Sequence, residues 1–231
     1  MAQTHDNATY ATDKSVSAAF YGPILLAQKQ KLFDLFVRAF PPDSSRTILN
    51  LGVNSALDRP EQYFFEHNYP HRASVTGAGL EPPRRYAEFF PEAGYVQVAR
   101  HEPLPFEDDA FDLVFCNAVI EHVGDRAAQA TFMREILRVG KSAWITTPNR
   151  WHPIEFHTIT PLIHFLPEPI YREIWRRMGF TFFCEEEHLN LLDEALLTSF
   201  VPDGVDYTMH KHHFLGFCSN LLLQIDTTRA G

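Results

Sequence analysis

A continuous apolar run, FDLVFCNAV at residues 111–119, is the feature that most constrains the fold. A strand that is hydrophobic at consecutive positions must be covered on both faces, which is typical of a central strand in a parallel sheet. Other segments have strand character: 46–51, 73–80, 94–99 and 141–148. Helical patterns lie among them, at 58–68, 82–90 and 125–139. This alternation predicts a doubly wound, Rossmann-like α/β domain whose mostly parallel sheet carries helices on both faces.

The segments that flank this alternating core are also predicted. Apolar residues recur at helical spacing from Ser15 to Phe40 and end at Pro41-Pro42, so we assign residues 1–44 to an N-terminal helical segment. Residues 45–231 would form the α/β domain. Its stretch 149–180, irregular and rich in proline, histidine and aromatic residues before a helix at 169–180, is interpreted as a lid-like insertion.

The C-terminal part is predicted to close the domain. A helix is expected at 190–200, with Asp193 in its first turn. Residues 205–226 are expected to form an antiparallel strand pair, with the second strand at 217–225. The sequence HKHH at 210–213 is interpreted as the solvated turn between these two strands.

Composition excludes several classes of function. The formal net charge is −9 and Lys and Arg do not cluster, which disfavours nucleic acid and anionic membranes as partners. The three cysteines are far apart without a C-x-x-C pair, as expected for reduced thiols in the cytosol. The N-terminus lacks the features of a signal peptide, and no apolar run approaches the roughly 20 residues of a membrane helix. We therefore expect a cytoplasmic protein without a membrane span; a homodimer is compatible with the sequence.

The turn after the first strand resembles a loop that holds a nucleotide-like ligand. Gly52 follows the strand directly, but Val53 to Ala56 stand where further glycines would be expected. Asp58 is predicted to cap the next helix, with Pro60 in its first turn. Because G-x-G-x-x-G is missing, a nicotinamide cofactor is disfavoured.

The stretch PLPFEDDAFDLVFCNAVIEHV (103–123) closely resembles the fourth-strand motif of class I S-adenosylmethionine-dependent methyltransferases, in particular the type 11-like group. KSAWITTPNR, from residue 141, matches the next strand of that family, so the resemblance covers about residues 45–150. It implies S-adenosyl-L-methionine as the cofactor. The sequences PNRW, PIEFHT and HFLP also resemble a subgroup of methyltransferases that act near cell-envelope glycans, which implies a small-molecule or glycan-related acceptor.

The resemblance places the family's cofactor-binding positions on residues of this chain. The first-strand acid falls on Asn50, and the three loop glycines fall on Gly52, Asn54 and Ala56. The acid after the third strand falls near Arg100 and His101. Asn117 fits a backbone contact to the cofactor.

The acid at the end of strand two, which binds the ribose in the family, falls on Gly79, with Glu81 two residues further on. The cofactor-binding candidates are Asn50, Gly52, Asn54, Glu81, His101 and Asn117. Each missing carboxylate bond is worth about 1.5–3 kcal/mol, or roughly tenfold to a hundredfold in affinity. Two functions are therefore weighed: a methyltransferase with a rebuilt site, and a non-catalytic binding or scaffold protein on the same fold.

Two histidines are candidates for the acceptor side of the site. His122 follows the fourth strand and can serve as a general base for an acceptor hydroxyl. This favours oxygen as the acceptor atom, with nitrogen as the alternative. His157, in the insertion, is the second catalytic candidate. The alternative for His122 is a hydrogen-bonded histidine packed under a loop, and the alternative for the insertion is a proline-stiffened loop whose aromatic residues pack on the sheet. His152, His157 and His164 have no regular ligand spacing, so no metal site is predicted.

Overall fold

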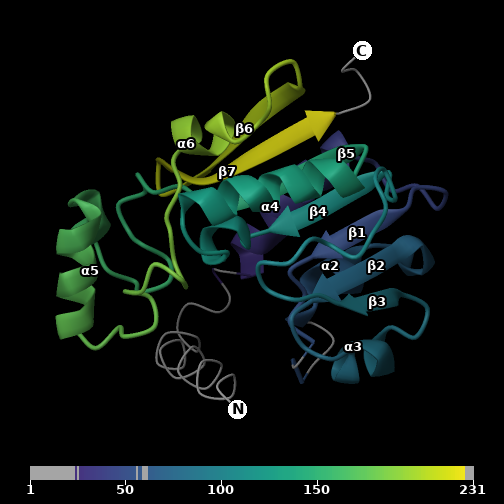
Figure 1. The fold of residues 1–231 in the computed structure, drawn as a ribbon, viewed down its shortest axis with the longest axis horizontal. Coiled ribbons are helices and arrows are strands. Elements are labelled where there is room, and N and C mark those ends of the chain that lie inside the picture. The colour runs from purple at the N-terminus through teal and green to yellow at the C-terminus, as the bar shows by residue number, and fades with distance from the viewer. Residues whose placement is uncertain (1–23, 25, 56, 59–61, 227–231) are drawn as a thin grey trace.

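The computed structural model describes residues 24, 26–55, 57–58 and 62–226. Their sheet has seven strands in the order β3-β2-β1-β4-β5-β7-β6 (Figure 1). Five strands are parallel: β1 (Ile48–Leu51), β2 (Val75–Gly79), β3 (Gly94–Gln97), β4 (Leu113–Asn117) and β5 (Ser142–Pro148). The last two, β6 (Asp206–Phe214) and β7 (Phe217–Asp226), are antiparallel. The predicted fold class is confirmed.

The apolar run at 111–119 forms the central strand, as predicted. In β4, Val114 lies opposite Leu49 of β1 on one side and Ala143 of β5 on the other. All three residues are fully buried. Consecutive residues of β4 point to opposite faces, so covering both faces requires an apolar residue at each position.

Helices cover both faces of this sheet. A helix over residues 26–39 precedes β1. The other α-helices are α2 (Phe64–Asn68), α3 (Arg84–Phe89), α4 (Arg126–Val139), α5 (Glu168–Arg177) and α6 (Glu194–Ser199). Short 3₁₀ helices within the described residues include η2 (Arg72–Ser74), η3 (Ile120–His122) and η4 (Ile163–Phe165).

Two apolar clusters divide the core between the two faces. On one face, Phe36 of the helix 26–39 and Phe65 of α2 pack against Phe115 and Trp144 of the sheet. On the other face, α4 and α6 bury their apolar stripes against β4, β5 and β7. The long helix α4 begins where Asp125 accepts a hydrogen bond from the Ala128 amide, which is an N-cap.

Two local predictions are wrong. Helix α2 begins at Phe64, so Asp58 does not cap it; residues 59–61 lie outside the described residues. HKHH lies inside β6, and the turn is made by Leu215 and Gly216, whose φ angles are 53° and 83°. Two consecutive positive φ angles suit the tight turn of a two-residue hairpin. Within β6, His212 is buried because alternate strand residues face the protein.

The stretch between β5 and α6 forms a small body beside the sheet, with α5 on its outer side (Figure 1). It has its own apolar cluster, in which Tyr171 and Trp175 of α5 pack with Phe183 and Leu189. Its separation from the sheet core is compatible with the predicted insertion. Of the helices that the structure describes, none has both the length and the apolar character needed to cross a membrane.

Candidate functional site

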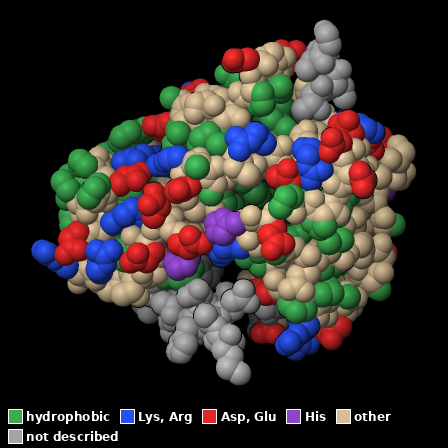
Figure 2. Space-filling model, viewed as in Figure 1, with side chains coloured by type: hydrophobic (Ala, Val, Ile, Leu, Met, Phe, Trp, Pro, Cys, Tyr) green, Lys and Arg blue, Asp and Glu red, His purple; other side chains and the backbone are tan. Residues whose placement is uncertain are grey.

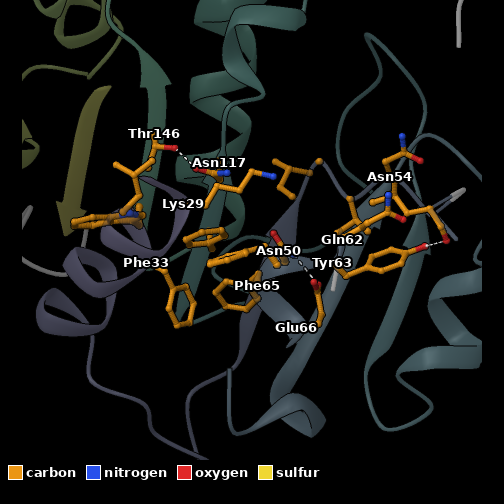
Figure 3. Close-up of a pocket in the computed structure, with 18 residues that line it drawn as sticks. Lys29, Phe33, Asn50, Asn54, Gln62, Tyr63, Phe65, Glu66, Asn117 and Thr146 are labelled. Carbon is orange, nitrogen blue, oxygen red and sulfur yellow. Dashed lines mark hydrogen bonds between the residues drawn. The ribbon is translucent and has the colours of Figure 1, made fainter. Parts of the chain in front are cut away.

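An open pocket lies at the carboxyl ends of β1, β4 and β5, beneath the helix 26–39 (Figure 3). Its cavity volume is about 190 Å³. Four of the predicted cofactor residues line it: Asn50, Gly52, Asn54 and Asn117. The carboxyl ends of parallel strands converge at one edge of the sheet, so residues distant in sequence meet there.

The loop after β1 turns at Gly52, whose φ angle is 99°. A Cβ at this position would lie only 2.2 Å from a methyl group of Val119, so both the backbone conformation and the space require glycine. The amides of Gly52 and Val53 both donate to the carbonyl of Ala78, at 2.8 and 2.9 Å. The loop is thereby attached to the end of β2.

This attachment explains why the end of β2 carries no acid. A Cβ built on Gly79 would lie 1.8 Å from the carbonyl oxygen of Val53. The loop occupies the volume that a side chain would need, so no other residue fits at Gly79 in this conformation. A ribose carboxylate at this position is therefore incompatible with the structure.

Glu81 and His101, the other two predicted cofactor-binding residues, do not line this pocket. The backbone carbonyl of Glu81 accepts a hydrogen bond from the Tyr95 hydroxyl at 2.8 Å. His101 Nε2 lies 3.0 Å from Glu187 Oε1 and lines a separate hollow. Glu81 and His101 can therefore contact only a ligand that extends beyond this pocket.

A buried carboxylate that the sequence analysis missed lies beside Asn50. Glu66 of α2 is 1% exposed, and its Oε1 accepts a hydrogen bond from Asn50 Nδ2 at 2.6 Å (Figure 3). The same oxygen accepts a second hydrogen bond from the Tyr86 hydroxyl at 3.0 Å. Burial raises the pKa of Glu66, and the hydrogen bonds from Asn50 and Tyr86 oppose the rise without cancelling it. The signal in the sequence was one charged residue among the aromatic residues of YFFEHNY.

The raised pKa of Glu66 predicts a pH dependence of stability. Above about pH 4.5, the unfolded chain releases a proton that the folded protein still holds, so the contribution of Glu66 to stability falls as pH rises through this window. A Glu66→Gln variant keeps the acceptor oxygen but does not titrate. We expect its unfolding free energy to fall less than that of the wild type between pH 4.5 and 8 in urea titrations. Parallel curves would contradict the prediction.

A cation also lines the pocket. Lys29, from the helix 26–39, extends over the pocket beside Asn117 (Figure 3). Asn117 in turn accepts a hydrogen bond from the Thr146 hydroxyl, which fixes its amide at the pocket wall. Lys29 was missed because it lies outside the stretch that carries the family resemblance, and only the tertiary structure brings its helix to the sheet edge.

The two catalytic candidates do meet, in a cluster apart from the pocket-lining residues. His122 Nε2 and His157 Nε2 are 3.2 Å apart. His157 Nδ1 lies 2.6 Å from Glu155 Oε1, and His122 Nδ1 lies 2.6 Å from the carbonyl oxygen of His188. Glu121, completely buried, accepts a hydrogen bond from the Thr147 hydroxyl at 3.0 Å. Thr147 follows Thr146 of the pocket wall in β5, and consecutive strand residues point to opposite faces of the sheet.

Burial alone would raise the pKa of Glu155, but the charge of His157 and the hydrogen bonds from His157 and Thr158 outweigh this effect. They hold the pKa of Glu155 at about 2, so its carboxyl group is ionised at neutral pH. The Thr158 amide and hydroxyl donate to Oε2 at 2.6 and 2.7 Å. Glu155 therefore holds His157 in place from within the insertion.

Comparison with known proteins identifies the domain. The family model described as a methyltransferase domain matches residues 62–143. Over these residues the chain is similar to a methyltransferase domain. This match confirms the resemblance drawn from residues 103–123, and it includes α2 to α4 and the start of β5.

Several solved structures share the fold at low sequence identity. A protein from Pyrococcus horikoshii OT3 is 14% identical, with a TM-score of 0.58 over 94% of this chain and 95% of that chain. The 1,6-didemethyltoxoflavin-N1-methyltransferase of Burkholderia thailandensis, solved with 1,6-didemethyltoxoflavin and S-adenosylhomocysteine, is 14% identical. Its TM-score is 0.53 over 97% of this chain and 90% of that chain.

A putative sarcosine dimethylglycine methyltransferase from Galdieria sulphuraria is 11% identical, with a TM-score of 0.54 over 88% of this chain and 86% of that chain. No curated protein sequence matches the chain at a significant level. At these identities the solved structures show the fold alone.

Proposed function

We propose that the protein transfers a methyl group from S-adenosyl-L-methionine to an oxygen of a small-molecule or glycan-related acceptor. The observation that carries the proposal is the pocket at the carboxyl ends of β1, β4 and β5 of a methyltransferase domain, lined by Asn50, Gly52, Asn54 and Asn117. In open α/β sheets, ligands bind at this edge. The Burkholderia neighbour holds a small molecule together with S-adenosylhomocysteine, which supports an acceptor of this size.

The residues of the pocket fit the amino-acid end of the cofactor better than its ribose. The ammonium group of Lys29 and the amides of Asn50 and Asn117 can bind a carboxylate and an ammonium group. Because no side chain fits at Gly79, the ribose lacks the usual carboxylate there. We assign binding of the ribose to Glu81 and His101, and the cofactor would have to extend beyond the pocket to reach them. When bound, the cofactor supplies an electrophilic methyl group; the protein contributes chiefly by positioning it.

We place His122 and His157 on the acceptor side. Their Nδ1 atoms contact the His188 carbonyl and Glu155, and their Nε2 atoms face each other at 3.2 Å. As a unit, the two rings can take up the proton of an acceptor hydroxyl. This arrangement supports transfer to oxygen, whose proton must be removed.

One observation favours the alternative, a non-catalytic binding or scaffold protein. The Val53 carbonyl closes the position at Gly79 where a methyltransferase of this type would bind the ribose. Losing that bond alone costs roughly tenfold to a hundredfold in affinity, which other contacts can offset. The alternative therefore depends on whether the cofactor binds at all.

Titration with the cofactor and its product tests the proposal. We expect S-adenosylmethionine and S-adenosylhomocysteine to bind with one site per chain by calorimetry and to raise the melting temperature. Lys29→Met should weaken binding about tenfold to a hundredfold, because a charge-assisted bond to the carboxylate is lost. Lys31→Met, on the exposed side of the same helix, is the matched control. No binding to the wild type at millimolar ligand would favour the non-catalytic alternative.

A further inference from the structure

We propose that Glu121, His122 and His157 bind a divalent cation, with Zn²⁺ as the best match. Their ligand atoms all lie within 4.8 Å of one another. Glu121 and His122 belong to η3, directly after β4, and His157 comes from the insertion 35 residues further along the chain. The inference goes beyond the proposed methyl transfer and would change one role in it: with a cation bound, the two Nε2 atoms are its ligands, and an acceptor hydroxyl would be activated at the open position of the cation instead of by free imidazoles. Metal binding can be measured without cofactor or acceptor.

The hydrogen bonds of the two imidazoles determine which nitrogens carry protons. The partner of His122 Nδ1 is the backbone carbonyl of His188, which can only accept, so this nitrogen is protonated. The partner of His157 Nδ1 is a carboxylate oxygen of Glu155, whose two oxygens also accept from the His157 amide and from the Thr158 amide and hydroxyl and so act as acceptors only. In neutral imidazoles the two Nε2 atoms therefore both carry lone pairs, and these atoms face each other at 3.2 Å.

Two lone pairs at this distance repel unless a positive charge lies between them. A proton shared by the two rings is one such charge, and a metal ion is the other. The separation itself matches a metal: two imidazole nitrogens at about 2.0–2.1 Å from a tetrahedral Zn²⁺ lie roughly 3.3 Å apart. The planes of the two rings are 86° apart, so the rings do not stack and both edges can face one ion.

The surroundings favour a metal ion over a shared proton. A proton would need only the two rings, whereas the carboxylate of buried Glu121 also converges on them. Glu155 and the His188 carbonyl hold the far nitrogens, as outer partners do for metal-bound histidines. Two imidazoles and one carboxylate form the ligand set of open zinc sites, in which a fourth position remains for water or a ligand. A divalent cation would also offset the charge of buried carboxylates.

Metal titration of the whole protein tests the inference. After dialysis against a chelator, we expect one equivalent of Zn²⁺ to bind by calorimetry and to raise the melting temperature. One equivalent of Co²⁺ should give the visible absorption of a tetrahedral ion. His122→Gln and Glu121→Gln should each weaken Zn²⁺ binding at least about tenfold. His213→Gln, an exposed histidine of β6, is the matched control and should bind like the wild type.

Several outcomes would overturn the inference. If the wild type takes up no Zn²⁺, or if His122→Gln binds as much as the wild type, the two rings share a proton instead. Circular dichroism of the variants shows whether they fold, and the wild-type stoichiometry decides the matter even if they do not. Because no cofactor is present, the result is distinguishable from a failure of the proposed methyl transfer.

Discussion

We expect Gly79→Asp, which restores the acid that methyltransferases of this type carry at the end of strand two, to destabilise the protein and not to improve cofactor binding. A Cβ at Gly79 would lie 1.8 Å from the Val53 carbonyl and 2.7 Å from the Tyr95 hydroxyl. The first contact is with backbone that the Ala78 carbonyl holds through two hydrogen bonds, so the loop must detach from β2. Overpacking of this kind costs about 3 kcal/mol.

For a domain of this size, that cost corresponds to a melting temperature lower by roughly 6–12 °C, which thermal unfolding would measure. Gly94→Ala is the matched control. Gly94 lies in the neighbouring strand β3, and its nearest contact would be the Thr76 hydroxyl at 3.1 Å, a side chain that can move. If Gly79→Asp melts like Gly94→Ala, the loop does not depend on glycine here, and the absent acid needs another explanation.

The sequence predicted the sheet because its determinants are local. The run at 111–119 cannot be covered by one layer of protein, and Asp125 marks the start of α4 by a cap that depends on four consecutive residues. The turn of the C-terminal hairpin was placed wrongly at 210–213, because polar residues were taken to indicate a turn. The backbone instead turns at Leu215-Gly216, where glycine accommodates a positive φ.

The sequence predicted the pocket residues that lie at strand ends but not those that lie on helices. Asn50, Gly52 and Asn117 lie at the ends of strands, and the topology alone brings these positions together. Lys29 and Glu66 lie on helices, and only the packing of those helices on the sheet brings them to the pocket. No side chain fits at Gly79 because the loop at Val53, 26 residues earlier, is attached to the end of β2. No sequence pattern in the loop or in β2 indicates this attachment.

Glu155 is the residue whose replacement should reveal most about the insertion. All four of its hydrogen-bonding partners are donors: the His157 amide and Nδ1 on one oxygen, and the Thr158 amide and hydroxyl on the other. In Glu155→Gln, the amide NH₂ must face two of these donors whichever way it is turned. We expect the variant to be less stable by about 3 kcal/mol at pH 7, measured by urea unfolding of the metal-free protein.

The pH dependence separates this effect from a simple loss of packing. The pKa of Glu155 is held at about 2, below its usual 4.5, so the ionised carboxylate stabilises the folded protein above pH 4.5. This contribution to stability is lost as the pH falls from 4.5 to 2. Gln does not titrate, so the difference between wild type and variant should shrink over that range. Glu173→Gln, an exposed acid of α5, should change stability little. If the difference in unfolding free energy between wild type and Glu155→Gln stays constant down to pH 2, Glu155 stabilises the fold by its shape and not by its charge. His157 would then lack the ionised partner that keeps its Nε2 lone pair directed at His122.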